Sequence, residues 1–165
     1  MRVLVAYASK HGSTEGIAHA IADRLRERGL DAEPSPVTDQ PDIGDAAAVV
    51  LGSAVYVGSW MREAVEFAER NAEALAERPV WLFSSGPLGE EVEDEEEQPK
   101  QLAELRGLID PEDHHVFFGA LFRSRLGFGE RMMVKAVKAP EGDYRDWDAI
   151  RGWADGIADR LQASS

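Results

Sequence analysis

A short polar loop near the N-terminus contains the residue types that bind phosphate. The loop lies between an apolar run and a helical pattern, and it reads Ser9-Lys10-His11-Gly12-Ser13-Thr14. Backbone N–H groups in the first turn of a helix have no acceptor within the helix, and the helix dipole favours an anion beside them. The three hydroxyl side chains can donate to phosphate oxygens, and the glycine permits close approach of the backbone. The loop therefore predicts a phosphate site, although Ser or Thr before a helix also serves as a simple N-cap.

The segments that must position this loop alternate between strand and helix patterns. Short apolar runs predict strands over residues 2–7, 31–37, 47–51, 79–83 and 115–118. Apolar residues at helical spacing predict helices over residues 13–28, 60–77, 100–108 and 146–161. This alternation is typical of an α/β fold, a parallel sheet with helices on both faces, and it predicts a single domain over residues 1–165. Pro34 and Pro36 favour an edge position for the second strand.

The composition limits the classes of function. The chain has 165 residues, of which 44% are apolar and 30% are charged, as in ordinary globular domains. Cysteine is absent, which excludes disulfides, zinc–thiolate sites, iron–sulfur clusters and a cysteine nucleophile. The net charge of −13 disfavours nucleic-acid binding. No apolar run approaches the ~18–20 residues that span a bilayer, so a cytoplasmic location is the default expectation.

Two segments depart from the alternation of strands and helices. Residues 90–97 hold seven acidic side chains in eight positions, and such a run usually forms a solvated loop. Residues 121–140, the basic segment, combine apolar side chains with a net charge of +4, which leaves −17 on the rest of the chain. The basic segment is either an element that contacts anionic groups or a structural segment that offsets the acidic body.

The first loop carries a resemblance to the flavodoxin superfamily. The phosphate loop of that superfamily follows the first strand and has the form Ser/Thr-x-Ser/Thr-Gly-x-Ser/Thr. Ser9, Gly12 and Thr14 match this form, while His11 stands where Thr or Ser is usual. Residues 50–60, and residues 119–121 with the basic segment and Asp146-Trp147 after them, are similar to one branch of the superfamily. That branch includes the menaquinone-dependent protoporphyrinogen IX dehydrogenases.

The resemblance implies a flavodoxin-like three-layer α/β/α fold with a five-stranded parallel sheet of order 2-1-3-4-5. It also implies FMN across the carboxyl ends of strands 1, 3 and 4, with its phosphate in the first loop and its ring between two further loops. The residues implied to contact FMN are Ser9, Lys10, His11, Gly12, Ser13, Thr14, Ser53, Ala54, Val55, Tyr56, Val57, Gly58, Trp60, Ser84, Ser85, Gly86, Pro87, Leu88 and Gly89.

Two of these assignments have a plain structural alternative. Tyr56 or Trp60 can stack on a flat ring, but Trp60 at the start of a helix pattern also suits core packing. The loop that begins at Ser84 contains two glycines, and its backbone N–H groups can face the pyrimidine edge of the ring. The same loop is otherwise a simple turn.

No side chains in the sequence are typical of acid–base or nucleophilic catalysis. His19 falls on the outer face of its helix pattern and is expected at the surface, and His114 and His115 begin a strand and are expected to be packed or solvated. We therefore expect no catalytic side chain and no metal site. Redox chemistry would belong to FMN, while the protein would set its position and its potential.

The resemblance implies an FMN-dependent oxidoreductase similar to quinone-linked protoporphyrinogen oxidase. In such an enzyme, Arg123, Arg125 and Arg131 of the basic segment would meet porphyrin propionates or the anionic head groups at the inner face of a membrane. Two alternatives stay open. One is a flavodoxin-type one-electron carrier that docks on a basic partner, and the other is a non-redox module in which residues 90–97 form the contact.

Overall fold

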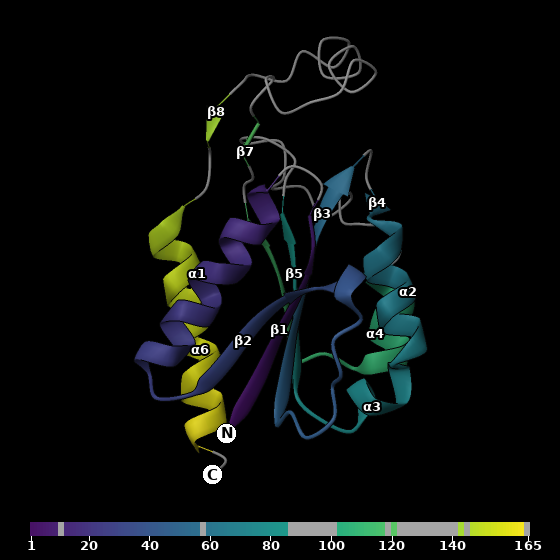
Figure 1. Cartoon of the computed structure of the whole chain (residues 1–165), viewed down its shortest axis with the longest axis horizontal. Helices are drawn as coiled ribbons and strands as arrows, with labels where there is room; N and C mark the ends of the chain where they lie inside the picture. Colours follow the sequence, from purple (N-terminus) through teal and green to yellow (C-terminus); the bar gives the residue numbers. More distant parts are fainter. Residues whose placement is uncertain are drawn as a thin grey trace.

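Five parallel strands form the central sheet. The computed structural model describes residues 1–9, 12–56, 59–85, 102–117, 120–121, 142–143 and 146–163. The sheet has the order β2-β1-β3-β5-β6 (Figure 1), and its neighbouring strands all pair in parallel. These strands are β1 (Arg2–Ala8), β2 (Asp31–Pro36), β3 (Ala48–Tyr56), β5 (Val80–Ser85) and β6 (Asp113–Phe117). The order confirms the predicted fold class, and β2 with its prolines lies at an edge of the sheet, as expected.

Two short antiparallel pairs lie off this parallel path, toward the carboxyl ends of the strands (Figure 1). In the first, β4 (Ser59–Trp60) pairs with β3, so that Val55 is opposite Trp60 and Tyr56 is opposite Ser59. In the second, β7 (Ala120–Leu121) pairs with β8 (Gly142–Asp143). β3 continues beyond the predicted end of its strand at residue 51, because residues 52–54 still pair with β1 or β5 and residues 55–56 pair with β4.

Helices cover both faces of the sheet. On one face lie α1 (Ser13–Glu27) and α6 (Trp147–Ala163), and on the other lie α2 (Arg62–Arg70), α3 (Ala72–Ala76) and α4 (Leu102–Ile109) (Figure 1). Alternate residues of β1 divide between two cores, with Val3 and Val5 beside α1 and α6, and Leu4 and Ala6 beside α2 and α4. The continuous apolar runs of the sequence therefore reflect strands that are buried on both faces. A short 3-10 turn, η1 (Val37–Asp39), follows β2.

The segment predicted as one helix over residues 60–77 is divided. Trp60 lies in β4, and α3 is separated from α2 by Asn71, whose backbone has φ −109° and ψ 18°. The Asn71 side-chain amide donates to the carbonyl of Phe67 at 2.8 Å. The prediction of a single helix was wrong because apolar spacing records neither this hydrogen bond nor the pairing of Trp60 with β3.

Ion pairs hold α1 against α6. The Arg24 guanidinium contacts the Asp155 carboxylate through hydrogen bonds of 2.8 and 3.2 Å. Arg28 contacts the same carboxylate at 3.1 Å and also pairs with Asp159. The buried side chains of α1 and α6 belong to one core cluster. Together these contacts fix the axis of α1, and with it the place of its first turn.

Several predicted functional residues lie outside the described residues. They are Lys10, His11, Val57, Gly58, residues 86–89, the acidic run 90–97 and the three arginines of the basic segment. The side chain of Tyr56, which was predicted to stack on the ring, lies outside the description as well. Their assigned roles stay predictions, as does the single domain. Among the helices of the described residues, none is long and apolar enough to cross a membrane.

Candidate functional site

The turn between β1 and α1 is built around the left-handed backbone of Gly12. This residue has φ 85° and ψ −9°, a conformation that strains any residue with a Cβ atom. Its N–H donates to Ser9 Oγ at 3.1 Å, and its carbonyl accepts the first helical hydrogen bond, from the Gly16 N–H at 3.1 Å. Within the described part of the chain, no side chain caps α1. A helix end of this kind attracts anions, because its first N–H groups find no acceptor within the helix.

Thr14 presents a buried hydroxyl group in the first turn of α1. Its side chain is fully buried, and its Oγ1 atom makes no hydrogen bond to any residue that the structure describes. A buried hydroxyl group without a partner costs ~1–3 kcal/mol. A ligand oxygen at the start of α1 would remove this cost, so the residues of the turn fit a group with several anionic oxygens, such as a phosphate.

A hollow of about 220 Å³ lies beside the turn. Its walls come from β1, β2, η1 and the starts of α1 and α2, and they consist of Tyr7, Ala8, Ser9, Gly12, Glu15, Pro36, Thr38, Met61 and Glu63. The Tyr7 hydroxyl donates to Glu15 at 3.3 Å, and burial, together with the Glu15 carboxylate, raises the pKa of Tyr7 to about 12. The carboxylates of Glu15 and Glu63 disfavour an anion within the hollow itself. The donors for an anion are therefore those at the start of α1.

The register of the sheet brings the ends of β3 and β5 to the same edge as this turn. Ala8 of β1 lies opposite Ser53 of β3. In turn, Ser53 lies opposite Ser84 of β5, and Ala54 lies opposite Ser85. The three serines are buried, whereas Ala54 is half-buried. The structure therefore brings together the beginnings of all three loops that the resemblance assigned to FMN.

The Ser53 hydroxyl closes the connection between β3 and α2. It donates to the carbonyl of Ala54 at 2.8 Å and accepts the N–H of Met61 at 2.9 Å. Met61 is the residue before α2, and its backbone is extended. Ser53 thus fixes where α2 begins, while its contact with FMN stays a prediction.

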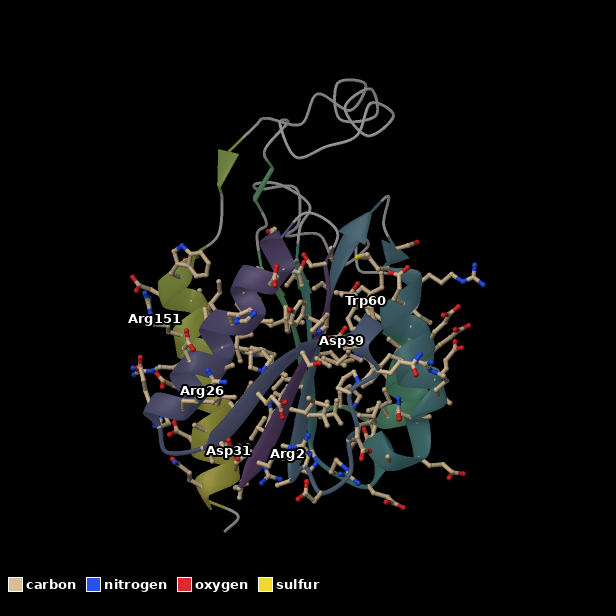
Figure 2. The ribbon with its side chains drawn as sticks, viewed as in Figure 1. Arg2, Arg26, Asp31, Asp39, Trp60 and Arg151 are labelled. Carbon is tan, nitrogen blue, oxygen red and sulfur yellow. The ribbon has the colours of Figure 1, made fainter. Side chains whose placement is uncertain are left out.

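A chain of hydrogen bonds joins the buried Trp60 and Ser84 to the half-buried His114. The Trp60 indole N–H donates to Ser84 Oγ at 2.7 Å, and the same oxygen lies 2.7 Å from His114 Nε2. Trp60 is 4% exposed and lies between the sheet and α2 (Figure 2). This is the core-packing arrangement that the sequence left open, and a contact of Trp60 with the ring of FMN stays a prediction.

The histidines differ in their surroundings. Burial, with a smaller contribution from the Arg106 cation, lowers the pKa of His114 to about 4, so its imidazole is neutral at pH 7. The pKa of His115 is lowered by burial too, and its ring lies against Phe117 with centroids 4.4 Å apart. His19 is exposed on α1, as expected.

The hydrogen bond between His114 and Ser84 was not predicted from the sequence. His114 lies opposite Leu82 in the register of β5 and β6, and Ser84 follows Leu82 by two residues. Because side chains alternate along a strand, His114 and Ser84 point to the same face of the sheet. The proximity of His114 and Ser84 could therefore be inferred only once the order and the register of the two strands were known.

The strand order and the glycine turn that leads from β1 into α1 are those of a flavodoxin-type α/β protein. The family model described as a flavodoxin domain matches residues 4–148. This range includes the turn, the ends of β3 and β5, and the hydrogen-bond chain. The chain belongs to the flavodoxin domain family, and membership implies a flavin cofactor, typically FMN.

Individual relatives agree with this assignment. The chain is 24% identical over 172 residues to the protoporphyrinogen IX dehydrogenase [quinone] of Escherichia coli (strain K12), covering 96% of this chain and 95% of the relative. It is similar to the structure of a flavodoxin from the domain Archaea, with a TM-score of 0.66 and 17% identity over 98% of this chain and 99% of the other. It also resembles rubredoxin oxygen:oxidoreductase from Desulfovibrio gigas, with a TM-score of 0.65 and 18% identity over 98% of this chain. It spans only 36% of that longer protein.

Proposed function

We propose that this chain is an FMN-binding oxidoreductase that resembles quinone-linked protoporphyrinogen oxidase. The observation that carries the FMN assignment is the buried Thr14 hydroxyl, which has no partner among the described residues, beside the left-handed turn at Gly12. The substrate class is supported by the likeness to the Escherichia coli dehydrogenase, which extends over 96% of this chain.

The described residues that would hold FMN divide between its phosphate and its ring. Ser9 and the first residues of α1, with Gly12 before them, would hold the phosphate. The ends of β3 and β5, with Ala54, Tyr56 and Ser85, would border the ring. When bound, FMN supplies the acceptance and release of electrons and hydride.

The charges of the protein would act on the potential of the cofactor. The net charge is −13, and the carboxylates of Glu15 and Glu63 line the hollow beside the turn. Negative charge near a site disfavours further negative charge there, so we expect the protein to lower the reduction potential of its cofactor. His114 and His115 are half-buried on β6, and His19 is exposed on α1. The proposal assigns no proton transfer to these three histidines.

Two experiments test the proposal in sequence. The cofactor of the native protein is released and identified by mass spectrometry, where we expect FMN. The protein is then supplied with protoporphyrinogen IX and menaquinone, and we expect oxidation faster than with free FMN at the same concentration. A colourless protein that takes up no FMN contradicts the flavin assignment, and a rate equal to that of free FMN contradicts the enzyme assignment.

A second candidate is a one-electron carrier without a substrate of its own. The observation that favours it is the net charge of −13, which would steer the protein to a basic partner. FMN binding without porphyrin turnover, together with salt-sensitive reduction by a basic redox protein, would support this candidate. A chain that binds no flavin would leave the non-redox interaction module.

For the enzyme, we assign substrate or head-group contact to Arg123, Arg125 and Arg131. This assignment rests on their charge within the apolar, basic segment and would place the protein at the inner face of a membrane. Arg123→Glu with Arg125→Glu should weaken binding to anionic liposomes or to porphyrin while FMN affinity stays the same. Unchanged binding would show that the segment only offsets the acidic body.

A further inference from the structure

The β3–β4 hairpin, which we define as Val55, Tyr56, Ser59 and Trp60, stands at the carboxyl edge of the sheet. Its strands pair Val55 with Trp60 and Tyr56 with Ser59. Two pairings are few for an isolated antiparallel ribbon, which is marginally stable in water. The place of the hairpin must therefore be fixed by contacts with the rest of the molecule.

Two such contacts are made at its base. The Met61 N–H, one residue after the hairpin, donates to Ser53 Oγ at 2.9 Å. The Trp60 indole donates to Ser84 Oγ at 2.7 Å, which ties β4 to the end of β5. Trp60 is 4% exposed and Ser84 is fully buried, so water does not compete for this hydrogen bond.

The protons of the hydrogen-bond chain can be assigned from its chemistry. An indole nitrogen can only donate, so Ser84 Oγ accepts from Trp60. His114 is neutral at pH 7 because burial lowers its pKa. No other acceptor for the Ser84 hydroxyl is found among the described residues, so its proton points to His114 Nε2. Because Nε2 then accepts a hydrogen bond, the proton of the neutral imidazole must be on Nδ1. With this assignment the Trp60 indole N–H donates to Ser84 Oγ, and the Ser84 hydroxyl donates to His114 Nε2.

We propose that Ser84 and His114 are positioning residues that hold the β3–β4 hairpin in its final place before a flavin arrives. The hairpin is then a preformed wall at the edge of the ring site, and no binding energy is spent on ordering it. The part of this inference that concerns flavin rests on the proposed function. The part that concerns the order of the hairpin does not.

Amide hydrogen exchange of the flavin-free protein tests the order of the hairpin. Ser84→Ala and Trp60→Phe each remove one partner of the chain, and we expect the backbone amides at positions 55 and 60 to exchange about tenfold faster or more. Trp81→Phe is the matched control, because Trp81 is 5% exposed on β5 and packs in the opposite core. Exchange in β1 reports whether each variant is folded.

Two further readouts separate positioning from general stability. Nitrogen-15 NMR of His114 should show the Nδ1–H form in the wild type and a loss of that preference in Ser84→Ala. Ser84→Thr, which keeps the hydroxyl, should restore slow exchange of the hairpin. Unchanged exchange in both Ser84→Ala and Trp60→Phe, or no rescue by threonine, would overturn the inference whether or not the protein binds flavin.

Binding of two flavins tests the preformed wall. Ser84→Ala should raise the dissociation constants of FMN and of riboflavin by the same factor, about 5–20-fold, because the ring is common to both ligands. Thr14→Ala should weaken FMN much more than riboflavin, which has no phosphate. A loosened hairpin with unchanged flavin affinity would refute the preformed wall. If the wild type binds neither flavin, the proposed function fails, and hydrogen exchange alone decides whether the chain orders the hairpin.

Discussion

The turn at the start of α1 and the hydrogen-bond chain beneath the β3–β4 hairpin lie at the same edge of the sheet, yet the hydroxyl groups of Thr14 and Ser84 are in opposite states. Thr14 Oγ1 is fully buried and unpaired among the described residues. Ser84 Oγ is equally buried but accepts one hydrogen bond and lies within bonding distance of a second partner.

This difference suggests that the two regions serve a ligand in different ways. A satisfied polar network adds to the stability of the fold and fixes its geometry. An unsatisfied hydroxyl costs stability until a ligand pairs with it. The hydrogen-bond chain through Ser84 is therefore suited to fix the geometry of a site. The turn with Thr14 is suited to bind a charged group.

Gly52→Ala should have the largest effect, because it disturbs both regions together. Gly52 lies opposite Phe83 on β5, between the two regions, and a Cβ atom at residue 52 would be 2.0 Å from Phe83 Cζ. We expect the free energy of unfolding to fall by about 3 kcal/mol, the upper end of the usual cost of overpacking.

Urea denaturation measures this change. Gly107→Ala in α4 is the control, because a Cβ atom there meets no atom within 4 Å. Alanine should leave stability unchanged or raise it by up to ~1 kcal/mol at that position. A Gly52→Ala protein as stable as wild type would mean that the Phe83 ring can move aside at little cost in free energy.

Thr14→Val should separate cofactor binding from stability. Valine has nearly the shape of threonine but no hydroxyl, so the protein without flavin should be as stable as wild type or more stable. The dissociation constant of FMN should rise roughly 10–150-fold, which corresponds to the loss of one charge-assisted hydrogen bond of ~1.5–3 kcal/mol. Flavin titration followed by fluorescence gives the constant, and a clear loss of stability without flavin would show that the hydroxyl already has a partner.

Ser84→Ala should show the reverse pattern. The substitution removes the Ser84 oxygen that accepts the buried Trp60 indole N–H, so the free energy of unfolding without flavin should fall by ~1–2 kcal/mol. Urea denaturation of Ser84→Ala and Thr14→Val under the same conditions, without flavin, compares their free energies of unfolding directly. Equal stability of the two variants would refute the difference between the two regions.

The pH dependence of stability gives the smallest expected effect. The pKa of His114 is about 4 in the folded protein and close to 6.5 when unfolded, so the unfolded chain takes up the proton first as pH falls. The stabilisation due to neutral His114 is complete above pH 6.5 and is lost between pH 6.5 and 4. From pH 7 to pH 6, wild type should lose up to ~0.7 kcal/mol more than His114→Gln. His115 titrates in the same direction but is present in both proteins, so the difference isolates His114.

The sequence was a good guide to features that depend on neighbouring residues. Apolar runs and helical spacing predicted the five parallel strands, and the order that the resemblance implied is confirmed. The glycine and hydroxyl residues of the first loop predicted a turn that begins a helix, and Gly12 and Ser13 do so.

The features that sequence reasoning missed depend on residues far apart in the chain. Trp60 was assigned to a helix, but its backbone pairs with Val55 and its indole donates to Ser84, 24 positions away. His114 reaches Ser84 across 30 positions. Neither contact leaves a periodic pattern, so each could be read only from the order and register of the strands.

The burial of Trp60 has a practical consequence for spectroscopy. Trp60 and Trp81 are at most 5% exposed, whereas Trp147 and Trp153 are half-buried. A buried indole emits at shorter wavelength than a solvent-exposed one. Loosening of the hairpin would expose Trp60 to water and should shift part of the fluorescence emission to the red. An isoalloxazine absorbs where tryptophan emits, and its arrival would quench the same signal by energy transfer. Tryptophan fluorescence can therefore report both events. A red shift of the emission band indicates loosening of the hairpin, and a loss of its intensity indicates flavin binding.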